Sequence, residues 1–404
     1  MTYTDFERVE IARTEYSSQT IGHRLKKFGK TIGYVSDVVN DGTGQNAYVI
    51  TDKPVTSSAS SVKQVTVLYR GSSANISMDA ADDWLDNDIP AAVNILINNQ
   101  SPTPQLLASS QTLKDMMAKY PKAQFDVYGH SLGSMDAQYA VANLSVKQQS
   151  RLSGGYFYEG PNIYNMLNDK QRDNVKALNQ LNKTFNYVDT KDLVPLGYGA
   201  DKNTVGLYVK VLSKNGTGKI DQHMWGGYQF DDDGNGSLYV DPSVVSEYAN
   251  VITTKKLSLL NTLKAKFMNG GSMTAGQKQL LDEYQAIALV EGMQTIVASQ
   301  MKSLQMTYEQ AIDEANSLWQ EAEFNSGIIG QHLSHYEREA ALDAGGVTKE
   351  NVKTKPVSDY GRSIDKLKPI QQKYQQLSQQ INQAIKHQTE TDNELAGQIR
   401  GMLW

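Results

Sequence analysis

In the stretch Phe125-Asp-Val-Tyr-Gly-His-Ser-Leu-Gly133, an apolar and aromatic run leads directly into a serine between two glycines. The first four residues are typical of a short strand. Residues 132–146 then follow with small and apolar side chains at helical spacing. The stretch therefore predicts a strand, a tight turn at Ser131 and a helix.

The same alternation of strand and helix patterns extends to both sides of this turn. Runs rich in β-branched and aromatic residues predict further strands at residues 47–51, 65–69, 155–158 and 184–188. Helical periodicity predicts helices at residues 106–120 and 165–181. Because strands that alternate with helices pair in parallel through crossovers, we expect a mostly parallel sheet with helices on both faces.

The composition and the residue pattern of the chain change near residue 250. Eight of the ten prolines lie between Pro54 and Pro242, whereas the later sequence is rich in glutamine and has apolar residues every three or four positions. Residues 1–250 therefore predict an α/β domain, with its motifs within 45–240. Residues 251–404 predict an all-α helical hairpin or bundle, with a loop at 343–356.

Composition excludes several classes of protein. The 404 residues carry 39 Lys and Arg against 44 Asp and Glu, a formal net charge of −5, which argues against a nucleic-acid partner. The chain has no cysteine, so disulfides, thiolate metal sites and a cysteine nucleophile are excluded. It shows no phosphate-binding glycine loop or dinucleotide fingerprint, and we expect no cofactor.

The sequence predicts neither a membrane span nor a signal peptide. No uninterrupted apolar run of about 18 residues predicts a membrane span. The charged N-terminal sequence lacks the basic region, apolar region and cleavage site of a signal peptide. A cytoplasmic location and secretion by a route without a signal peptide both remain open.

Ser131 lies in a G-x-S-x-G motif at the predicted strand-to-helix turn. Such a turn presents the serine Oγ at the edge of the sheet, and the N-terminus of the following helix stabilises negative charge beside it. A glycine-rich turn without chemistry would have the same five residues. The flanking strand and helix favour a nucleophile.

A serine nucleophile needs a base, and the imidazole that serves as base needs an acid to fix its tautomer. In folds with this serine turn, the acid and then the histidine follow the serine along the chain. His223 is the first histidine after Ser131, and the later ones lie in the helical half. Asp189 and Asp192 both follow the predicted strand at 184–188, where such sheets place their sites, and either can be the acid.

Acyl transfer also needs hydrogen-bond donors for the oxyanion. The backbone N–H of Leu132, directly after the predicted nucleophile, is one candidate. Ser72 is the other, because it lies in a turn that ends the predicted strand at 65–69 and can donate its N–H or its hydroxyl.

Taken together, these motifs resemble the class 3 family of α/β-hydrolase lipases. The resemblance covers about residues 45–240 and rests on the Arg70-Gly-Ser-Ser73 turn, Trp84, the Gly129-His-Ser-Leu-Gly133 motif, the Asp192-Leu-Val-Pro195 segment and His223.

The resemblance implies an α/β-hydrolase fold and a lipase activity. It implies a catalytic triad of Ser131, Asp192 and His223, with Ser72 and Leu132 at the oxyanion hole, and it favours Asp192 over Asp189. It also implies a lid helix at residues 76–99, for which a plain surface helix is the alternative.

The helical half resembles the LXG-type targeting domains of type VII-secreted toxins in Gram-positive bacteria, here placed after the enzyme rather than before it. That resemblance implies a secreted lipase toxin that attacks membrane phospholipids. It also implies small helical partner proteins on residues 251–404 and a cognate immunity protein. Two other functions stay open: an intracellular carboxylesterase with a helical appendage, and a catalytically inert interaction scaffold.

Two patterns contain residue types that bind metal ions, and both are incomplete as metal sites. Asp231-Asp-Asp-Gly-Asn-Gly-Ser237 matches the first positions of a calcium loop, but Pro242 stands where the closing glutamate belongs, which favours a hairpin turn. His332 and His335 share a helix face without a third ligand nearby, as on a solvated surface. We therefore expect no metal site.

Overall fold

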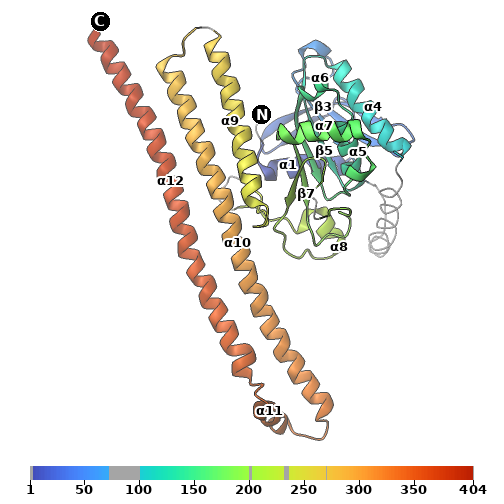
Figure 1. Cartoon of the computed structure of the whole chain (residues 1–404), viewed down its shortest axis with the longest axis vertical. Coiled ribbons are helices and arrows are strands. Elements are labelled where there is room, and N and C mark those ends of the chain that lie inside the picture. Colours follow the sequence, from blue (N-terminus) through green and yellow to red (C-terminus); the bar gives the residue numbers. More distant parts are fainter. Residues whose placement is uncertain (1–2, 72–100, 200–202, 232–235, 270, 404) are drawn as a thin grey trace. The chain divides into compact units, whose positions relative to one another are not determined.

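The computed structural model describes residues 3–71, 101–199, 203–231, 236–269 and 271–403, with side chains up to residue 387. The chain forms two compact units, Met1–Ile252 (unit 1) and Thr253–Trp404 (unit 2). Figure 1 shows the strands in unit 1 and the long helices of unit 2. The division lies close to the predicted boundary at residue 250.

Among the described residues, unit 1 is built on a mixed eight-stranded sheet whose strands lie in chain order. The first four pair antiparallel: β1 (Arg24–Lys27), β2 (Lys30–Asn40), β3 (Asn46–Thr51) and β4 (Gln64–Tyr69). The rest continue parallel from β4: β5 (Gln124–His130), β6 (Leu152–Tyr158), β7 (Thr184–Val188) and β8 (Leu207–Lys210). The expected parallel pairing therefore begins only at β4. Short connections join β1 to β2 and β2 to β3, and the longer one from β3 to β4 contains only the turn η2 (Ala59–Ser61) and no crossover α-helix, so these neighbours pair antiparallel.

Helices pack on both faces of this sheet. On one face, α4 (Pro104–Lys119), α5 (Leu132–Ala142) and α7 (Asp169–Gln180) share a buried apolar cluster with side chains of β4, β5 and β6 (Figure 1). Val127 belongs to that cluster, whereas the next residue, Tyr128, meets Arg8 of α1 (Asp5–Ala12). Because successive strand residues point to opposite faces, α1 covers the other side.

The face toward α1 is lined with aromatic rings. The guanidinium of Arg8 lies 4.0 Å from the ring centroid of Tyr156, which stacks on Phe185 of the neighbouring strand. Tyr248, at the start of α9 (Val245–Met268), makes edge contacts with Phe185 and Tyr187. Short turns complete unit 1: η1 (Arg13–Tyr16), η2 (Ala59–Ser61), α6 (Val146–Gln149), η4 (Tyr164–Met166), α8 (Lys219–Asp221) and η5 (Gln222–Gly226).

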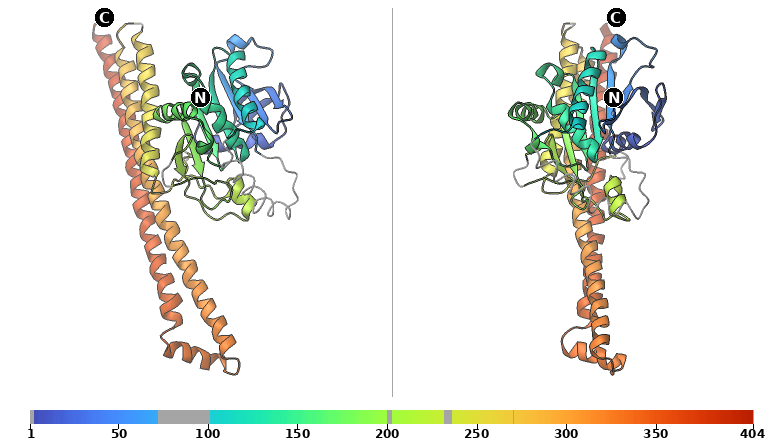
Figure 2. Two further views of the ribbon diagram at one scale, coloured as in Figure 1. Left: turned by 45° about the vertical axis from the view of Figure 1, so that its right-hand side comes forward. Right: turned by 90° about the vertical axis from the view of Figure 1, so that its right-hand side faces the viewer.

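Unit 2 is helical. It contains α10 (Ala275–Ile329), α11 (His335–Ala344), the turn η6 (Glu350–Thr354) and α12 (Lys355–Leu403). Figure 2 shows α10 and α12 side by side, and the ring centroids of Tyr308 and Tyr360 lie 6.1 Å apart between them. A C-terminal helical region is thus confirmed. The predicted loop at 343–356 was wrong in part, because η6 lies within it and Pro356 is tolerated in the first turn of α12.

Few described side chains of unit 2 are buried. In α10 they are Leu281, Ala288, Ser299, Ala315 and Trp319. Large apolar side chains are instead exposed along the helices: Leu280, Tyr284, Leu289, Met293, Leu304, Leu318, Ile370, Leu377 and Ile381. Within the described part of the chain, no helix is both long and apolar enough to cross a membrane.

Candidate active site

Ser131 lies at the junction of β5 and α5, on the predicted turn. Its φ of 55° and ψ of −129° are values that residues other than glycine rarely adopt. Ser131 occupies the N-cap position of α5, where serine usually caps the helix with its side chain, yet it makes no capping bond. Its buried Oγ has no hydrogen-bond partner among the described residues. The hydroxyl therefore does not serve to hold the turn together.

The glycines on either side of Ser131 are required by close packing. A Cβ atom on Gly129 would lie 2.1 Å from the carbonyl oxygen of Gly133. A Cβ atom on Gly133 would lie 2.2 Å from the carbonyl oxygen of Tyr69, at the end of β4. Either distance is a severe clash, so the elbow (residues 129–133) packs against the end of β4 only if both positions are glycine.

The turn that follows β4 lies beside the elbow. A Cβ atom on Gly71 would come within 3.1 Å of the Cβ atom of Ser131. The next residue, Ser72, was predicted as an oxyanion donor and lies outside the described residues, as does the predicted lid helix at 76–99. Leu132, the other predicted donor, is the first residue of α5, where a backbone N–H has no partner within the helix.

His223 and Asp192 form a hydrogen bond in unit 1. Nδ1 of His223 lies 2.7 Å from Oδ2 of Asp192, with only 6% and 2% of the two side chains exposed. Because an ionised carboxylate only accepts, Nδ1 carries the proton and Nε2 of the neutral ring is the acceptor. The backbone N–H of Val194 donates to Oδ1 of Asp192 at 3.1 Å and fixes the carboxylate. The pair has the arrangement of a general base and its orienting acid.

Asp189, the other candidate acid, has different partners. Its Oδ1 accepts the hydroxyl of Ser213 at 2.6 Å and the N–H of Lys191 at 2.9 Å. Its Oδ2 accepts from the side-chain amide of Gln222. Burial raises the pKa of Asp189. This residue therefore anchors the segment directly before His223, while the imidazole bonds to Asp192.

Glu159 is a buried acid of the same region that the sequence analysis missed. It follows β6 with a φ of 46°, and its carboxyl group accepts the N–H of Asp189 at 2.9 Å and the hydroxyl of Tyr228. Burial, and then the charges of Asp192 and Asp189, raise the pKa of Glu159 well above its ordinary value. A neutral Glu159 avoids a second negative charge near Asp192. In the sequence, Glu159 is marked only as an acidic residue directly after the predicted strand at 155–158.

His130 links the elbow to the His223 segment. Its Nε2 lies 2.8 Å from the backbone oxygen of His223, and its Nδ1 lies 2.6 Å from the hydroxyl of Tyr16. Burial, with smaller effects of His223 and Arg13, lowers the pKa of His130 well below its usual value, so the ring is neutral. Because a carbonyl oxygen only accepts, Nε2 carries the proton and the Tyr16 hydroxyl donates to Nδ1.

The incomplete calcium pattern is only partly described. The N–H of Asp231 donates to the backbone oxygen of Ser237 at 3.0 Å, and the N–H of Ser237 donates to Oδ1 of Asp231 at 2.9 Å. Residues 232–235 between them lie outside the described residues. These two bonds close a turn, as the hairpin interpretation expects.

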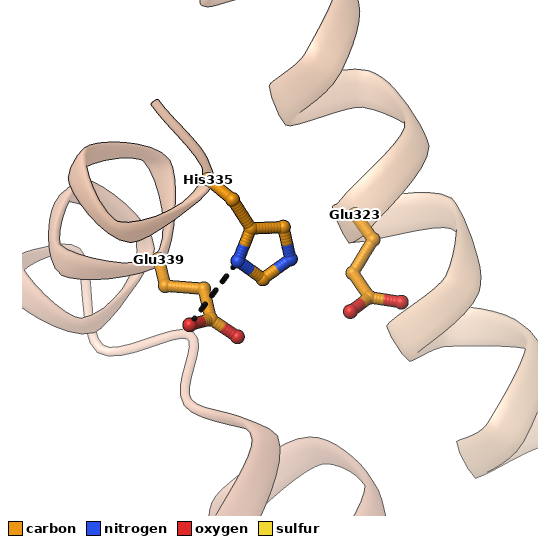
Figure 3. Close-up of side chains that lie close together, drawn as sticks. All are labelled: Glu323, His335 and Glu339. Carbon is orange, nitrogen blue, oxygen red and sulfur yellow. Dashed lines mark ion pairs between the residues drawn. The ribbon is translucent and has the colours of Figure 1, made fainter. Parts of the chain in front are cut away.

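Three side chains of unit 2 with atoms that can bind a metal ion lie close together. One ligand atom each from Glu323, His335 and Glu339 lies within 4.8 Å of the others, and Nδ1 of His335 pairs with Oε2 of Glu339 at 3.5 Å (Figure 3). Glu323 and His335 are exposed. The pair of His335 and Glu339 spans one turn of α11, whereas Glu323 lies on α10. His332 lies in the turn before α11, so the prediction that it shares a helix face with His335 was wrong.

Comparison with known proteins gives one weak structural likeness to report. No family model matches the sequence, and no curated protein matches it. Among solved structures, the native Rhizomucor miehei lipase propeptide complex matches with a TM-score of 0.31 and 15% identity. The match covers 50% of this chain and 66% of that chain, just under two thirds of its length. A likeness of this strength carries no argument about activity.

Proposed function

We propose that the chain is a serine acylhydrolase of the α/β-hydrolase type that cleaves the carboxyl esters of membrane phospholipids. One observation carries the proposal: a buried hydroxyl without a described partner, on a strained strand-to-helix turn, in the same unit as a buried His223–Asp192 pair. A nucleophile, a base and an acid are the three parts that acyl transfer to serine requires.

In the proposed mechanism, Ser131 Oγ attacks the ester carbonyl carbon and its proton passes to Nε2 of His223. Asp192 accepts the hydrogen bond from Nδ1 and stabilises the imidazolium that forms. His223 then protonates the leaving alcohol, and an acyl group remains on Ser131. Water, deprotonated by His223, attacks this ester, and His223 returns the proton to Ser131 Oγ as the acyl–oxygen bond breaks and the fatty acid leaves. The N–H groups of Leu132 and Ser72 stabilise the oxyanion in both steps.

The choice of lipid rests on the resemblance of the motifs to class 3 lipases and on the proposed role as a toxin. Such a toxin must reach a membrane, whose abundant esters are phospholipids. A cognate immunity protein would block the active site in the producing cell. We propose secretion through a type VII system, which needs no signal peptide.

Unit 2 would serve this export. Its helices expose large apolar side chains, among them Leu289 and Met293 at a four-residue spacing on α10. Residues four apart lie on one helix face, so these two form an apolar strip that a small helical partner would cover. Deletion of residues 253–404 should then abolish secretion of the chain from its producing cell.

The test of the activity is fatty-acid release by the purified full chain from phospholipid vesicles, a triglyceride emulsion and a short soluble ester. Ser131→Ala should lower turnover on vesicles by about 10³-fold or more, because it removes the nucleophile. The matched control is Ser150→Ala, which removes an exposed hydroxyl bonded to the Lys147 carbonyl oxygen and should leave turnover unchanged.

The outcomes separate the candidate functions. Release from vesicles that depends on Ser131 supports a phospholipase. Activity confined to the short ester would favour a carboxylesterase with a helical appendage. Turnover that is equal in wild type and Ser131→Ala would exclude Ser131 as the nucleophile, and no turnover on any ester would favour an inert interaction scaffold.

A further inference from the structure

The turn η1 reaches the elbow from a distant part of the sequence. Its residue Tyr16 contacts His130 across 114 positions of the chain, and the preceding residue, Glu15, is fully buried. Neither residue belongs to the proposed triad or oxyanion hole, and both make hydrogen bonds to the segments that carry them.

We propose that Glu15 and Tyr16 are positioning residues that connect three separate parts of the proposed active site: the turn after β4, the elbow and the His223 segment. This inference rests on the proposed function. The two residues would hold the backbone at Gly71, the nucleophile and the base in place relative to one another without touching the substrate.

Glu15 connects the turn after β4 to the elbow. Its Oε1 accepts the backbone N–H of Gly71 at 3.3 Å, and the backbone N–H of His130 is near enough to lower the pKa of the same carboxyl group. Gly71 precedes the proposed donor Ser72, and His130 precedes the proposed nucleophile Ser131. A single buried carboxyl group therefore ties the backbone before the donor to the backbone before the nucleophile.

The surroundings of Glu15 keep it neutral. Burial raises its pKa well above the ordinary value, against smaller opposing effects from the Gly71 N–H, the charge of Arg70 and the neighbouring Tyr16 hydroxyl. Its Oε2 makes no well-formed hydrogen bond to any described residue. A neutral carboxylic acid still accepts the Gly71 N–H, so the isosteric amide of glutamine can replace it.

Tyr16 connects the elbow to the backbone of His223. Its hydroxyl donates to Nδ1 of His130 at 2.6 Å, which leaves Nε2–H of that ring to donate to the His223 oxygen at 2.8 Å. Without the Tyr16 donor, the proton of His130 can move to Nδ1, and Nε2 then repels the carbonyl oxygen. The loss would loosen the segment that carries the proposed base.

The experiment compares Tyr16→Phe, Glu15→Leu and Glu15→Gln in the full chain, with the short soluble ester as substrate. Tyr16→Phe and Glu15→Leu should lower kcat by roughly 10-fold or more and leave KM within about 2-fold, because ground-state binding does not depend on these distances. Glu15→Gln should stay within about 3-fold of wild type, because its amide oxygen still accepts.

Two matched controls report general destabilisation. Tyr248→Phe removes a hydroxyl that donates to Asp5 at 2.9 Å, and Thr14→Val removes the η1 hydroxyl that donates to the Glu10 oxygen at 3.2 Å. Both should keep kcat within about 2-fold at similar thermal shifts. An equal fall of kcat in these controls, or a fall in Glu15→Gln as large as in Glu15→Leu, would overturn the inference.

Nitrogen NMR of the histidine side chains gives a readout that does not depend on turnover. Wild type should show His130 protonated at Nε2, and Tyr16→Phe should show a mixture of tautomers. If Tyr16→Phe changes the His130 tautomer but wild type shows no Ser131-dependent turnover, the hydrogen-bonded link stands and the proposed function is wrong. If wild type is active and Tyr16→Phe changes neither kcat nor the His130 tautomer, the link is wrong and the proposed function stands.

Discussion

The two units differ in what they bury. Unit 1 removes ionisable groups from water, including Glu15, His130, Asp136 and Glu159, and most of their hydrogen bonds join distant segments. Unit 2 buries few side chains among its described residues and leaves large apolar ones exposed. A unit that desolvates acids and histidines can perturb their chemistry, whereas one that exposes an apolar strip is suited to association.

Histidine substitutions in the two units should show the largest contrast. His223→Asn removes the proposed base and should lower turnover on ester substrates by roughly 10⁴-fold. His335→Asn removes an exposed ring of α11 that pairs with Glu339, and turnover should not change. Steady-state hydrolysis by both variants measures this difference. Comparable losses would mean that unit 2 contributes to the chemistry.

Removal of apolar side chains should give the next largest contrast. Phe157 in β6 is fully buried, and Phe157→Ala should lower the free energy of unfolding by about 3–5 kcal/mol because it leaves a cavity. Leu304 in α10 is 47% exposed, and Leu304→Ala should cost under about 1 kcal/mol. Urea denaturation of the full chain gives both values. A larger loss from Leu304→Ala would show that this helix face is covered.

Local signals predicted the parts of the fold that depend on short stretches of sequence. The elbow at Ser131 was predicted because its glycines, strand and helix are consecutive. The antiparallel pairing of β1–β4 was not expected, because it follows from connection length rather than from alternating strands and helices. Helical periodicity predicted the helices of unit 2 but did not show that the chain forms η6 directly before α12.

The candidate site depends more on long-range contacts. Asp189 and Asp192 both follow β7, and their position alone does not separate them. The resemblance to class 3 lipases favoured Asp192, and the tertiary partners show that Asp192 meets His223 while Asp189 holds Gln222. Glu15 also could not be found from its neighbours in the sequence, because its partner Gly71 is 56 positions away. Spacing predicts which residue types share a turn, but it does not predict which distant backbone groups they meet.

The pH dependence of stability should be a property of unit 1. Asp136 of α5 is buried, Gln105 donates to its Oδ2 at 2.8 Å, and burial raises its pKa to about 8. Its contribution to stability is complete below the unfolded pKa and is lost as the pH rises toward the folded pKa, because the unfolded chain ionises first. From about pH 5 to about pH 7.5, this group alone should remove roughly 3 kcal/mol.

Asp136→Asn tests this dependence because asparagine cannot ionise and its oxygen still accepts from Gln105. The free energy of unfolding of the variant, from urea titrations at both pH values, should fall less with pH than that of wild type. Parallel pH profiles of the two proteins would mean that Asp136 is already ionised in the folded state. Asp115→Asn, on the exposed side of α4, serves as the control.

The smallest effect on stability is expected on the apolar strip of α10. Leu289 and Met293 are 52% and 60% exposed, so the double change to serine should alter the free energy of unfolding by under about 1 kcal/mol. The adjacent Ala288 is only 3% exposed, and Ala288→Leu should cost about 1–3 kcal/mol through overpacking. Urea denaturation of both variants measures this contrast. If the serine variant were the less stable of the two, the strip would be part of the packed interior of unit 2. Unit 2 would then not present an apolar surface, and the contrast with unit 1, which buries its ionisable groups, would fail.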